Sequence, residues 1–151
     1  MWTLDGKPFE PDEEKLKEWT GFVYLITEID TGKKYVGKKL FWSTRRLPPI
    51  KGKKRRRVVV SESDWKTYFG SSETVKQLVE SKGDSAFKRE ILHLCHGKGE
   101  MAYLETKEQF DREVLFRDDY YNGIIHCRIN QRTVQKMKEH YELSKSEKNR
   151  S

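Results

Sequence analysis

Residues 21–39, GFVYLITEIDTGKKYVGKK, decide the fold of this 151-residue chain. Residues 22–26 form a continuous run of aromatic and β-branched residues, which is typical of a strand buried on both faces in the centre of a small sheet. Residues 30–33, DTGK, have the composition of a turn, and residues 34–37, KYVG, resume a strand pattern. The segment therefore predicts a β-hairpin.

Two tyrosines occupy matching places in this hairpin. Tyr24 closes the tripeptide FVY at residues 22–24, and Tyr35 opens the tripeptide YVG at residues 35–37. Because side chains alternate between the two faces of a strand, a hairpin loop with an even number of residues puts both phenols on one face. The pair then converges on one site. The alternative is that both tyrosines simply fill a sheet face.

The overall composition favours a basic protein that binds polyanions. Apolar residues make up 34% of the chain, charged residues make up 36%, and the net charge is +7. Such a balance favours nucleic acid first and acidic membranes second. No apolar run approaches the ~20 residues of a membrane span, and the N-terminus lacks the apolar stretch of a signal peptide. We therefore expect a cytoplasmic protein with no membrane partner, located in the host cytoplasm if a phage encodes it.

The chain divides into three predicted segments. Residues 1–20 are expected to be a polar lead-in, residues 21–130 the main domain, and residues 131–151 a polar, Lys-rich tail. Within the main domain a helix is predicted after residue 72, a strand at 87–95 and a second helix from about residue 99. The pattern predicts an α+β fold with a small, mostly antiparallel three-stranded sheet flanked by helices.

A basic segment interrupts the main domain at residues 45–57. It contains eight basic residues and no acid, and Pro48, Pro49 and Gly52 break it, so we expect a long, mobile basic loop. Such a cluster neutralises phosphates and positions nucleic acid without reading its sequence, and it does not distinguish DNA from RNA. The alternatives are a solvated face or a localisation signal. The predicted nucleic-acid-binding residues are Arg46, Lys51, Lys53, Lys54, Arg55, Arg56 and Arg57.

The two tripeptides make the sequence resemble the GIY-YIG nuclease family. Residues 35–37 match its second tripeptide, whereas in the first tripeptide Phe22 stands in place of the family's glycine, directly after Gly21. The resemblance covers residues 21–125, and the short chain is similar to the small stand-alone members of phages and bacteria. It implies a DNA endonuclease of the GIY-YIG fold, with double-stranded DNA as the expected substrate.

The resemblance also implies a set of site residues in a fixed order. After the second tripeptide, the family carries an arginine that contacts the scissile phosphate, then a metal-binding glutamate on a helix, and then an asparagine. The chain offers Arg45 for the first role, with Arg46 as its competitor, and Glu105 for the second. Asn122 follows in the third role, where it either orients the catalytic strand or caps a turn.

A second glutamate, Glu108, competes with Glu105 for the metal. Glu108 has Arg112 at i+4, which is the arrangement of an ordinary surface ion pair on a helix. Glu105 has no cationic residue three or four positions away that would neutralise it. A carboxylate without a local partner is freer to bind a metal, so Glu105 is the favoured ligand.

The proposed chemistry explains why these residue types are needed together. Phosphodiester hydrolysis requires an attacking water and neutralisation of charge on the phosphoryl oxygens. Mg²⁺, with Mn²⁺ as the alternative, keeps most of its waters and can be held by one carboxylate together with phosphate oxygens. The resemblance implies that Tyr24 and Tyr35 accept a proton or position the water, without deciding which one does so.

A tyrosine has a pKa near 10 and is a poor base at neutral pH. We expect nearby cations, among them Lys38, to lower that pKa, and Lys38 therefore joins the predicted catalytic residues. The sequence thus predicts a single-metal DNA endonuclease. The alternative is a non-catalytic, basic nucleic-acid-binding protein that keeps the same fold.

Overall fold

The predicted hairpin lies at the centre of the fold. β3 (Gly21–Glu28) and β4 (Lys34–Leu40) pair in antiparallel register, with Tyr24 opposite Gly37 and Ile26 opposite Tyr35. On its other side β3 pairs with β7 (Phe87–Cys95), also antiparallel. The structure is a computed structural model that describes residues 1–149. It confirms the α+β class and the mostly antiparallel sheet.

The sheet is larger than the predicted three strands, because the N-terminal segment joins it. β1 (Trp2–Leu4) pairs in parallel with β7, and β2 (Lys7–Pro8) pairs with β1, which gives five strands in the order β2-β1-β7-β3-β4. Residues 1–20, expected to be only a polar lead-in, also form the short helix α1 (Glu13–Leu16). Trp2 explains the difference. Its indole is buried and donates a hydrogen bond of 2.7 Å to the Trp65 carbonyl.

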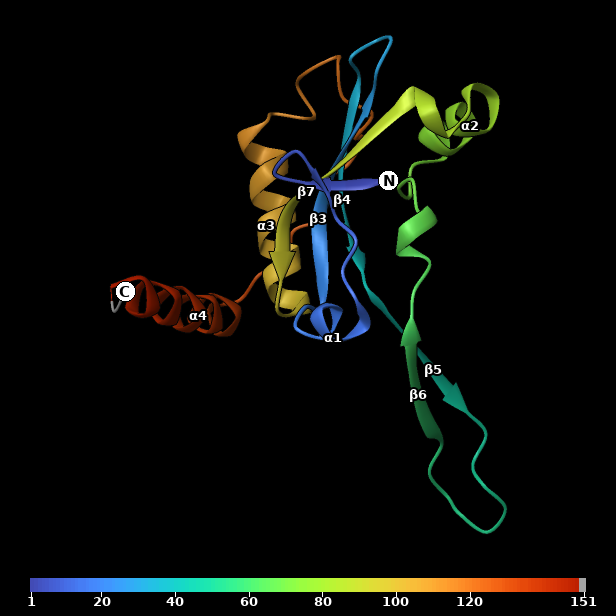
Figure 1. The fold of residues 1–151 in the computed structure, drawn as a ribbon, viewed down its shortest axis with the longest axis vertical. Coiled ribbons are helices and arrows are strands. Elements are labelled where there is room, and N and C mark those ends of the chain that lie inside the picture. The colour runs from blue at the N-terminus through green and yellow to red at the C-terminus, as the bar shows by residue number, and fades with distance from the viewer. Residues whose placement is uncertain (150–151) are drawn as a thin grey trace.

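Helices and turns cover both faces of this sheet (Figure 1). On one face Phe22, Tyr24 and Ile26 pack in a core with residues of α1, the 3₁₀ turn η1 (Trp65–Thr67) and α2 (Glu73–Lys82). On the other face Val23 and Leu25 pack with residues of α3 (Lys98–Asp111). The apolar run of β3 is therefore buried on both sides, as its sequence predicts. A second 3₁₀ turn, η2 (Asp84–Ala86), leads into β7.

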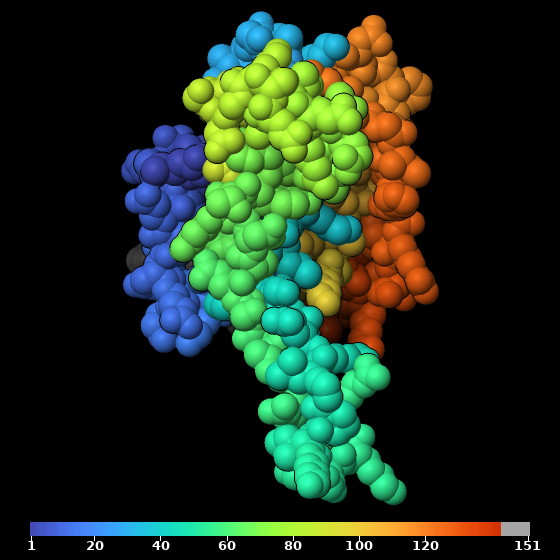
Figure 2. All heavy atoms as spheres, turned by 90° about the vertical axis from the view of Figure 1, so that its right-hand side faces the viewer, coloured from blue at the N-terminus to red at the C-terminus, as the bar shows by residue number. Residues whose placement is uncertain are grey.

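The segment predicted as a mobile basic loop forms the end of a two-stranded sheet that stands out from the body, with a loop at its tip. β5 (Trp42–Leu47) and β6 (Arg57–Glu62) pair in antiparallel register and form a projection clearly separate from the main sheet (Figures 1 and 2). The expected loop at 45–57 is therefore shortened to residues 48–56, because the β-branched run 58–60 pairs with residues 44–46. We call residues 42–62 the ribbon.

The C-terminal segment forms the helix α4 (Gln131–Asn149), which contacts the beginning of α3. A Cβ atom added at Gly99 would lie 2.7 Å from the Thr133 hydroxyl, so the glycine lets the two helices approach closely. The rings of His96 and His140 stack there, with centroids 4.5 Å apart. None of the helices within residues 1–149 combines the length and the apolar character that crossing a membrane requires.

A buried carboxylate fixes the turn of the central hairpin. Glu28, at the end of β3, is 1% exposed and accepts hydrogen bonds from the Thr31 hydroxyl, from the Tyr121 hydroxyl at 3.0 Å and from Lys82 Nζ at 3.1 Å. Burial alone would raise the pKa of Glu28, but these hydrogen bonds outweigh it and lower the pKa below the ordinary value of 4.5. The ionised carboxylate therefore joins the hairpin turn to α2 and to residue 121.

The lowered pKa makes stability depend on pH. Ionised Glu28 stabilises the fold above the unfolded pKa of 4.5, and this contribution is lost as pH falls through the lower folded value. We expect Glu28→Gln to reduce the free energy of unfolding by about 2–3 kcal/mol at pH 7 and to lessen the loss of stability on acidification. Urea unfolding at pH 7 and below pH 4 measures both effects.

Asp30→Asn is the matched control, because Asp30 pairs with the same Lys82 Nζ at 3.0 Å but is largely exposed. An exposed ion pair contributes less than about 1 kcal/mol. Equal losses in the two variants would contradict a special role for the buried carboxylate.

Candidate active site

The two hairpin tyrosines lie on one face of the sheet, as their spacing predicts. Their ring centroids are 6.3 Å apart, and the ring of Tyr68 meets Tyr24 edge-on at 6.0 Å. Tyr24 is 1% exposed, whereas Tyr35 is half-buried and its hydroxyl forms a hydrogen bond of 2.9 Å with the Ser71 hydroxyl. Three phenols therefore gather beside β4.

Gly37 makes room for the Tyr24 ring. Tyr24 lies directly opposite Gly37 in the β3–β4 register, and a Cβ atom added at Gly37 would lie 2.5 Å from Tyr24 Cζ. Real Cβ atoms do not approach ring carbons so closely, and the buried ring has no space to move. The glycine of the second tripeptide is thus required by the tyrosine of the first.

Glu105 and Lys38 approach the same strand from the other face. Lys38 lies opposite Val23, on the face that α3 covers, and its Nζ is 3.4 Å from Glu105 Oε1. The Glu105 side chain is only 13% exposed. Burial raises the pKa of Glu105, and the Lys38 ammonium partly offsets this effect. The site thus contains a carboxylate that is costly to ionise, beside one cation.

A cavity of about 350 Å³ at the outer edge of β4 joins the two groups. β4 is the last strand of the five-stranded sheet, so side chains from both of its faces reach the same space. Of the predicted site residues, Tyr35, Lys38, Glu105 and Asn122 line this cavity. Tyr24 lies behind it, against Tyr35 and Tyr68. The other lining residues are Tyr68, Ser71, Gln109, Gly123, Ile124 and His126.

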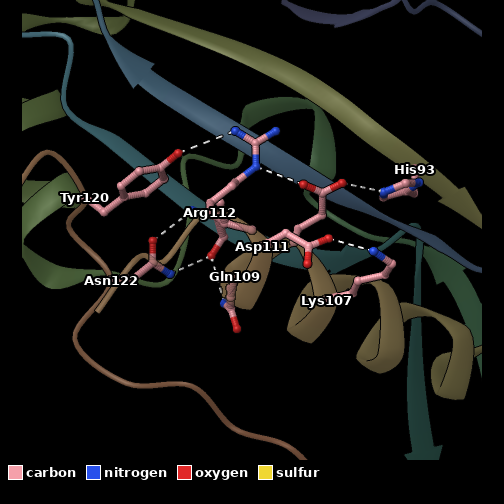
Figure 3. Close-up of polar contacts among 9 residues, drawn as sticks. His93, Lys107, Gln109, Asp111, Arg112, Tyr120 and Asn122 are labelled. Atoms are coloured by element: carbon pink, nitrogen blue, oxygen red, sulfur yellow. Dashed lines mark hydrogen bonds and ion pairs between the residues drawn. The ribbon is translucent and has the colours of Figure 1, made fainter. Parts of the chain in front are cut away.

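Asn122 holds the free edge of β4. Its side-chain oxygen accepts a hydrogen bond of 3.0 Å from the Val36 amide, and its side-chain nitrogen donates one of 2.8 Å to the Val36 carbonyl. Gln109 donates a second bond, of 3.2 Å, to the same carbonyl (Figure 3). The Asn122 side-chain amide thus makes the two backbone hydrogen bonds that a neighbouring strand would otherwise make with Val36. Of its two expected roles, this geometry matches orientation of the strand and not the capping of a turn.

Comparison with known families identifies the fold that surrounds this cavity. Residues 2–125 match the family described as "Putative endonuclease segE, GIY-YIG domain". The chain belongs to the GIY-YIG endonuclease family. The matched range starts at β1 and ends just after Asn122, so it contains every residue that lines the cavity except His126 and leaves out α4. Comparison with curated proteins and with solved structures gave no match.

The phenols of this GIY-YIG domain are harder to ionise than the sequence predicts. Burial raises the pKa of Tyr24 well above 10, and the neighbouring Tyr68 and Tyr35 add to the shift. Burial also raises the pKa of Tyr35, although its hydrogen bond with Ser71 opposes the change. The expectation that nearby cations lower these pKa values is wrong for the chain by itself, because burial dominates both shifts. Both phenols are protonated at neutral pH and can donate hydrogen bonds.

The competing glutamate is already engaged. Glu108 Oε2 accepts a hydrogen bond of 2.8 Å from Arg112 Nε, and Glu108 Oε1 forms another of 2.8 Å with His93 Nε2 (Figure 3). Burial on its own would raise the pKa of Glu108, but these two partners outweigh it and lower the pKa. The expected Glu108–Arg112 pair is present, so Glu105 is the carboxylate of this helix that faces the cavity.

Arg45 and Arg46 do not line the cavity. Both lie exposed on β5, because the chain leaves β4 through the buried Phe41 and continues into the ribbon. The structure therefore does not bring the expected phosphate-contacting arginine together with the tyrosines. The cation at the cavity is Lys38. The other predicted nucleic-acid-binding residues, at 51 and 53–57, are all exposed on the ribbon.

Sequence reasoning missed Tyr68, Ser71, Gln109 and His126, which are far from the hairpin in the chain. Tyr68 is positioned by the buried Arg89, whose guanidinium donates a hydrogen bond of 2.9 Å to the Tyr68 carbonyl. The only signal in the sequence is the aromatic cluster at residues 65–69, of which Trp65 belongs to the core. No local spacing relates these residues to β4.

The contact between Gly37 and Tyr24 is testable by adding one methyl group. We expect Gly37→Ala to displace the Tyr24 ring and to lower the free energy of unfolding by about 1–3 kcal/mol, with a parallel loss of any activity of the site. Thermal unfolding and the near-ultraviolet circular dichroism of the tyrosines measure the two effects on structure. Gly97→Ser is the control, because a Cβ at Gly97 meets nothing within 4 Å. An unchanged Gly37→Ala protein would contradict the close fit.

Proposed function

We propose that the chain is an endonuclease that hydrolyses the phosphodiester backbone of double-stranded DNA and uses one divalent cation, Mg²⁺ or Mn²⁺, held by Glu105. The observation that carries the proposal is the meeting of Tyr35, Lys38 and Glu105 at one cavity on the free edge of β4. Membership of an endonuclease family supports the reaction class. The net charge of +7 supports a nucleic acid as the substrate.

The residues of the cavity fit a hard divalent cation that keeps most of its waters. Among the side chains that the structure describes, up to residue 142, no group of three or more His, Cys, Asp or Glu residues is placed to enclose a metal. One carboxylate is enough for Mg²⁺ when phosphate oxygens and waters complete its shell. Glu105 suits this role, because burial penalises its charge and a cation relieves that penalty. When bound, the cation would neutralise charge on the phosphoryl oxygens.

The other side chains supply positioning and charge. Lys38 is 41% exposed, so its ammonium can turn from Glu105 to a phosphate oxygen. The Tyr35 hydroxyl is protonated and accessible from the cavity, and it donates a hydrogen bond to a phosphoryl oxygen or to the attacking water. Tyr24 is too buried to touch the substrate and acts by holding Tyr35. It is therefore a positioning residue in this proposal.

The proton of the attacking water goes to a group other than the two phenols, since both have raised pKa values. His126 lines the cavity and is the only histidine to do so among the described residues. A neutral imidazole nitrogen can accept a proton from a water molecule within hydrogen-bond reach. The proposal assigns this role to His126.

The metal assignment is tested by Glu105→Gln, with Glu108→Gln as the matched control on the same helix. We expect the first variant to lose Mg²⁺- or Mn²⁺-dependent nicking of a plasmid by at least about 100-fold, because the only carboxylate at the cavity is gone. It should also lose the rise in Tm that the metal gives to the parent. Without metal, its Tm should exceed that of the parent, because a buried carboxylate with a raised pKa destabilises the fold when ionised.

Glu108→Gln should keep the metal response and show a lower Tm, because it breaks contacts with Arg112 and His93. A Glu105→Gln protein that nicks DNA at the parental rate would overturn the metal assignment. A parent that binds DNA but never nicks it with either metal would instead favour the non-catalytic binding protein.

The basic loop of the ribbon is expected to contact DNA phosphates. Binding should weaken as salt rises, with a log–log slope of about −0.9 for each phosphate contact. Replacing Lys51, Lys53 and Lys54 by alanine should make the slope less steep by roughly one unit for each contact that is lost. Fluorescence anisotropy over a salt series measures the slope. A slope that the triple variant leaves unchanged would contradict phosphate contacts by the loop.

A further inference from the structure

We infer that the ribbon enters the major groove of DNA and reads base edges, and that the arginine on the face turned toward the bases, Arg45 or Arg46, determines sequence preference. The inference rests on the proposed action on double-stranded DNA and names the specificity element of that same enzyme. It differs from the expectation that the basic segment only positions the backbone.

The shape of the ribbon suits the major groove. Two antiparallel strands pair over six residues each, from Trp42 opposite Glu62 to Leu47 opposite Arg57. Within residues 1–149 no other strand pairs with either edge of the ribbon, and the projection stands out from the body in two perpendicular views (Figures 1 and 2). The major groove of B-DNA is about 12 Å wide and admits a two-stranded β-ribbon, whereas the minor groove is about 6 Å wide and does not.

The register gives each face of the ribbon the side chains that read bases. On one face Thr44 lies opposite Val60, and Arg46 lies opposite Val58. On the other face Arg45 lies opposite Val59. Arginine binds the O6 and N7 atoms of guanine with two hydrogen bonds, and small apolar groups contact the methyl group of thymine. Whichever face turns toward the base pairs, it presents an arginine beside a valine.

The three valines of the ribbon lie outside both cores of the described residues. Val58, Val59 and Val60 are 61%, 42% and 60% exposed, and none belongs to either core cluster. Consecutive exposed apolar residues mark an interaction site. The partner must also be strongly negative, because residues 45–57 carry eight basic residues and no acid. The major groove meets both conditions, whereas a second ribbon of the same charge would be repelled.

The root of the ribbon is held firmly, so its direction is fixed before DNA binds. Phe41 and Trp65 are buried on either side of the root. The Ser63 amide donates a hydrogen bond of 2.8 Å to the Phe41 carbonyl, and the Trp42 indole donates one of 3.0 Å to the Trp19 carbonyl. A recognition element that is already ordered loses less conformational entropy on binding.

The position of the root limits the distance along the DNA between the bases that the ribbon reads and the bond that is cut. Lys38 at the cavity and Arg45 on the ribbon are seven residues apart, which spans at most roughly 23 Å in an extended chain. A hollow of about 760 Å³ lies at the root, and its charged lining residues are Lys39, Lys98, Glu62 and Asp64. Lys39 is paired with Asp64 at 2.6 Å, so Lys98 is the lysine of the hollow that is left to meet a phosphate. The bases that are read should therefore lie within about one helical turn, roughly 10 bp, of the cut.

The test uses the Glu105→Gln protein, which binds without cutting, and selects bound duplexes from a random-sequence library. We compare it with the same protein carrying Arg45→Ala and Arg46→Ala. The control carries Lys51→Ala and Lys53→Ala, which remove the same charge from the loop. We expect the arginine pair to lower discrimination at the preferred positions by about 10- to 100-fold, and the lysine pair to weaken binding without changing the preferred sequence.

Protection of guanine N7 from dimethyl sulfate tests the groove directly, since N7 faces the major groove. The Glu105→Gln protein should protect guanines within the selected sequence, and the arginine pair should abolish that protection. The inference is overturned if both pairs of substitutions act alike, if no sequence is preferred, or if only minor-groove positions are protected. A dimer would also overturn it. If sedimentation shows that the parent is a dimer and that the Val59→Lys variant is a monomer, the valines contact a second copy of the chain and not DNA.

These outcomes separate the inference from the proposed function. A parent that nicks DNA with Mg²⁺ while the arginine pair leaves its sequence preference unchanged overturns the inference alone. A parent that protects guanine N7 through the arginine pair but never nicks DNA supports the inference for binding and removes the proposed catalysis.

Discussion

The free edge of β4 is the constraint on which the site depends. Tyr35 and Lys38 lie on opposite faces of this strand, and only at the margin of a sheet can side chains from both faces line one cavity. The backbone of residues 119–121 pairs with β4 only at Lys34. Beyond it the Asn122 side chain takes over and bonds both the amide and the carbonyl of Val36. The edge is therefore satisfied without a further full strand.

Glu28, which is buried, and Glu105, which is partly buried, are carboxylates in contrasting environments. Glu28 accepts hydrogen bonds from Thr31, Lys82 and Tyr121, which lowers its pKa. Glu105 has a single ammonium at 3.4 Å, and burial raises its pKa. The first carboxylate is satisfied and stabilises the hairpin turn. The second is only partly compensated by Lys38, which is consistent with the metal-binding role proposed for it.

The sequence predicts features that depend on neighbours in the chain and fails where distant packing decides. The hairpin, the shared face of Tyr24 and Tyr35, and the Glu108–Arg112 pair follow from strand and helix periods. The burial of Trp2, which draws β1 into the sheet, depends on Trp65 and is not visible locally. The position of Arg45 on the ribbon, away from the cavity, depends on the burial of Phe41. The raised pKa values of the tyrosines arise from tertiary burial, which the spacing of residues along the chain does not indicate.

The ribbon has its own hydrogen-bond ladder and joins the body only at its root, near Phe41 and Ser63. Its strands contribute no residue to the β3-centred sheet, so changes in its length or side chains leave the reaction centre intact. If the proposed roles of the ribbon and the cavity hold, a change of about twenty contiguous residues can redirect the enzyme to new targets without altering the residues of the cavity.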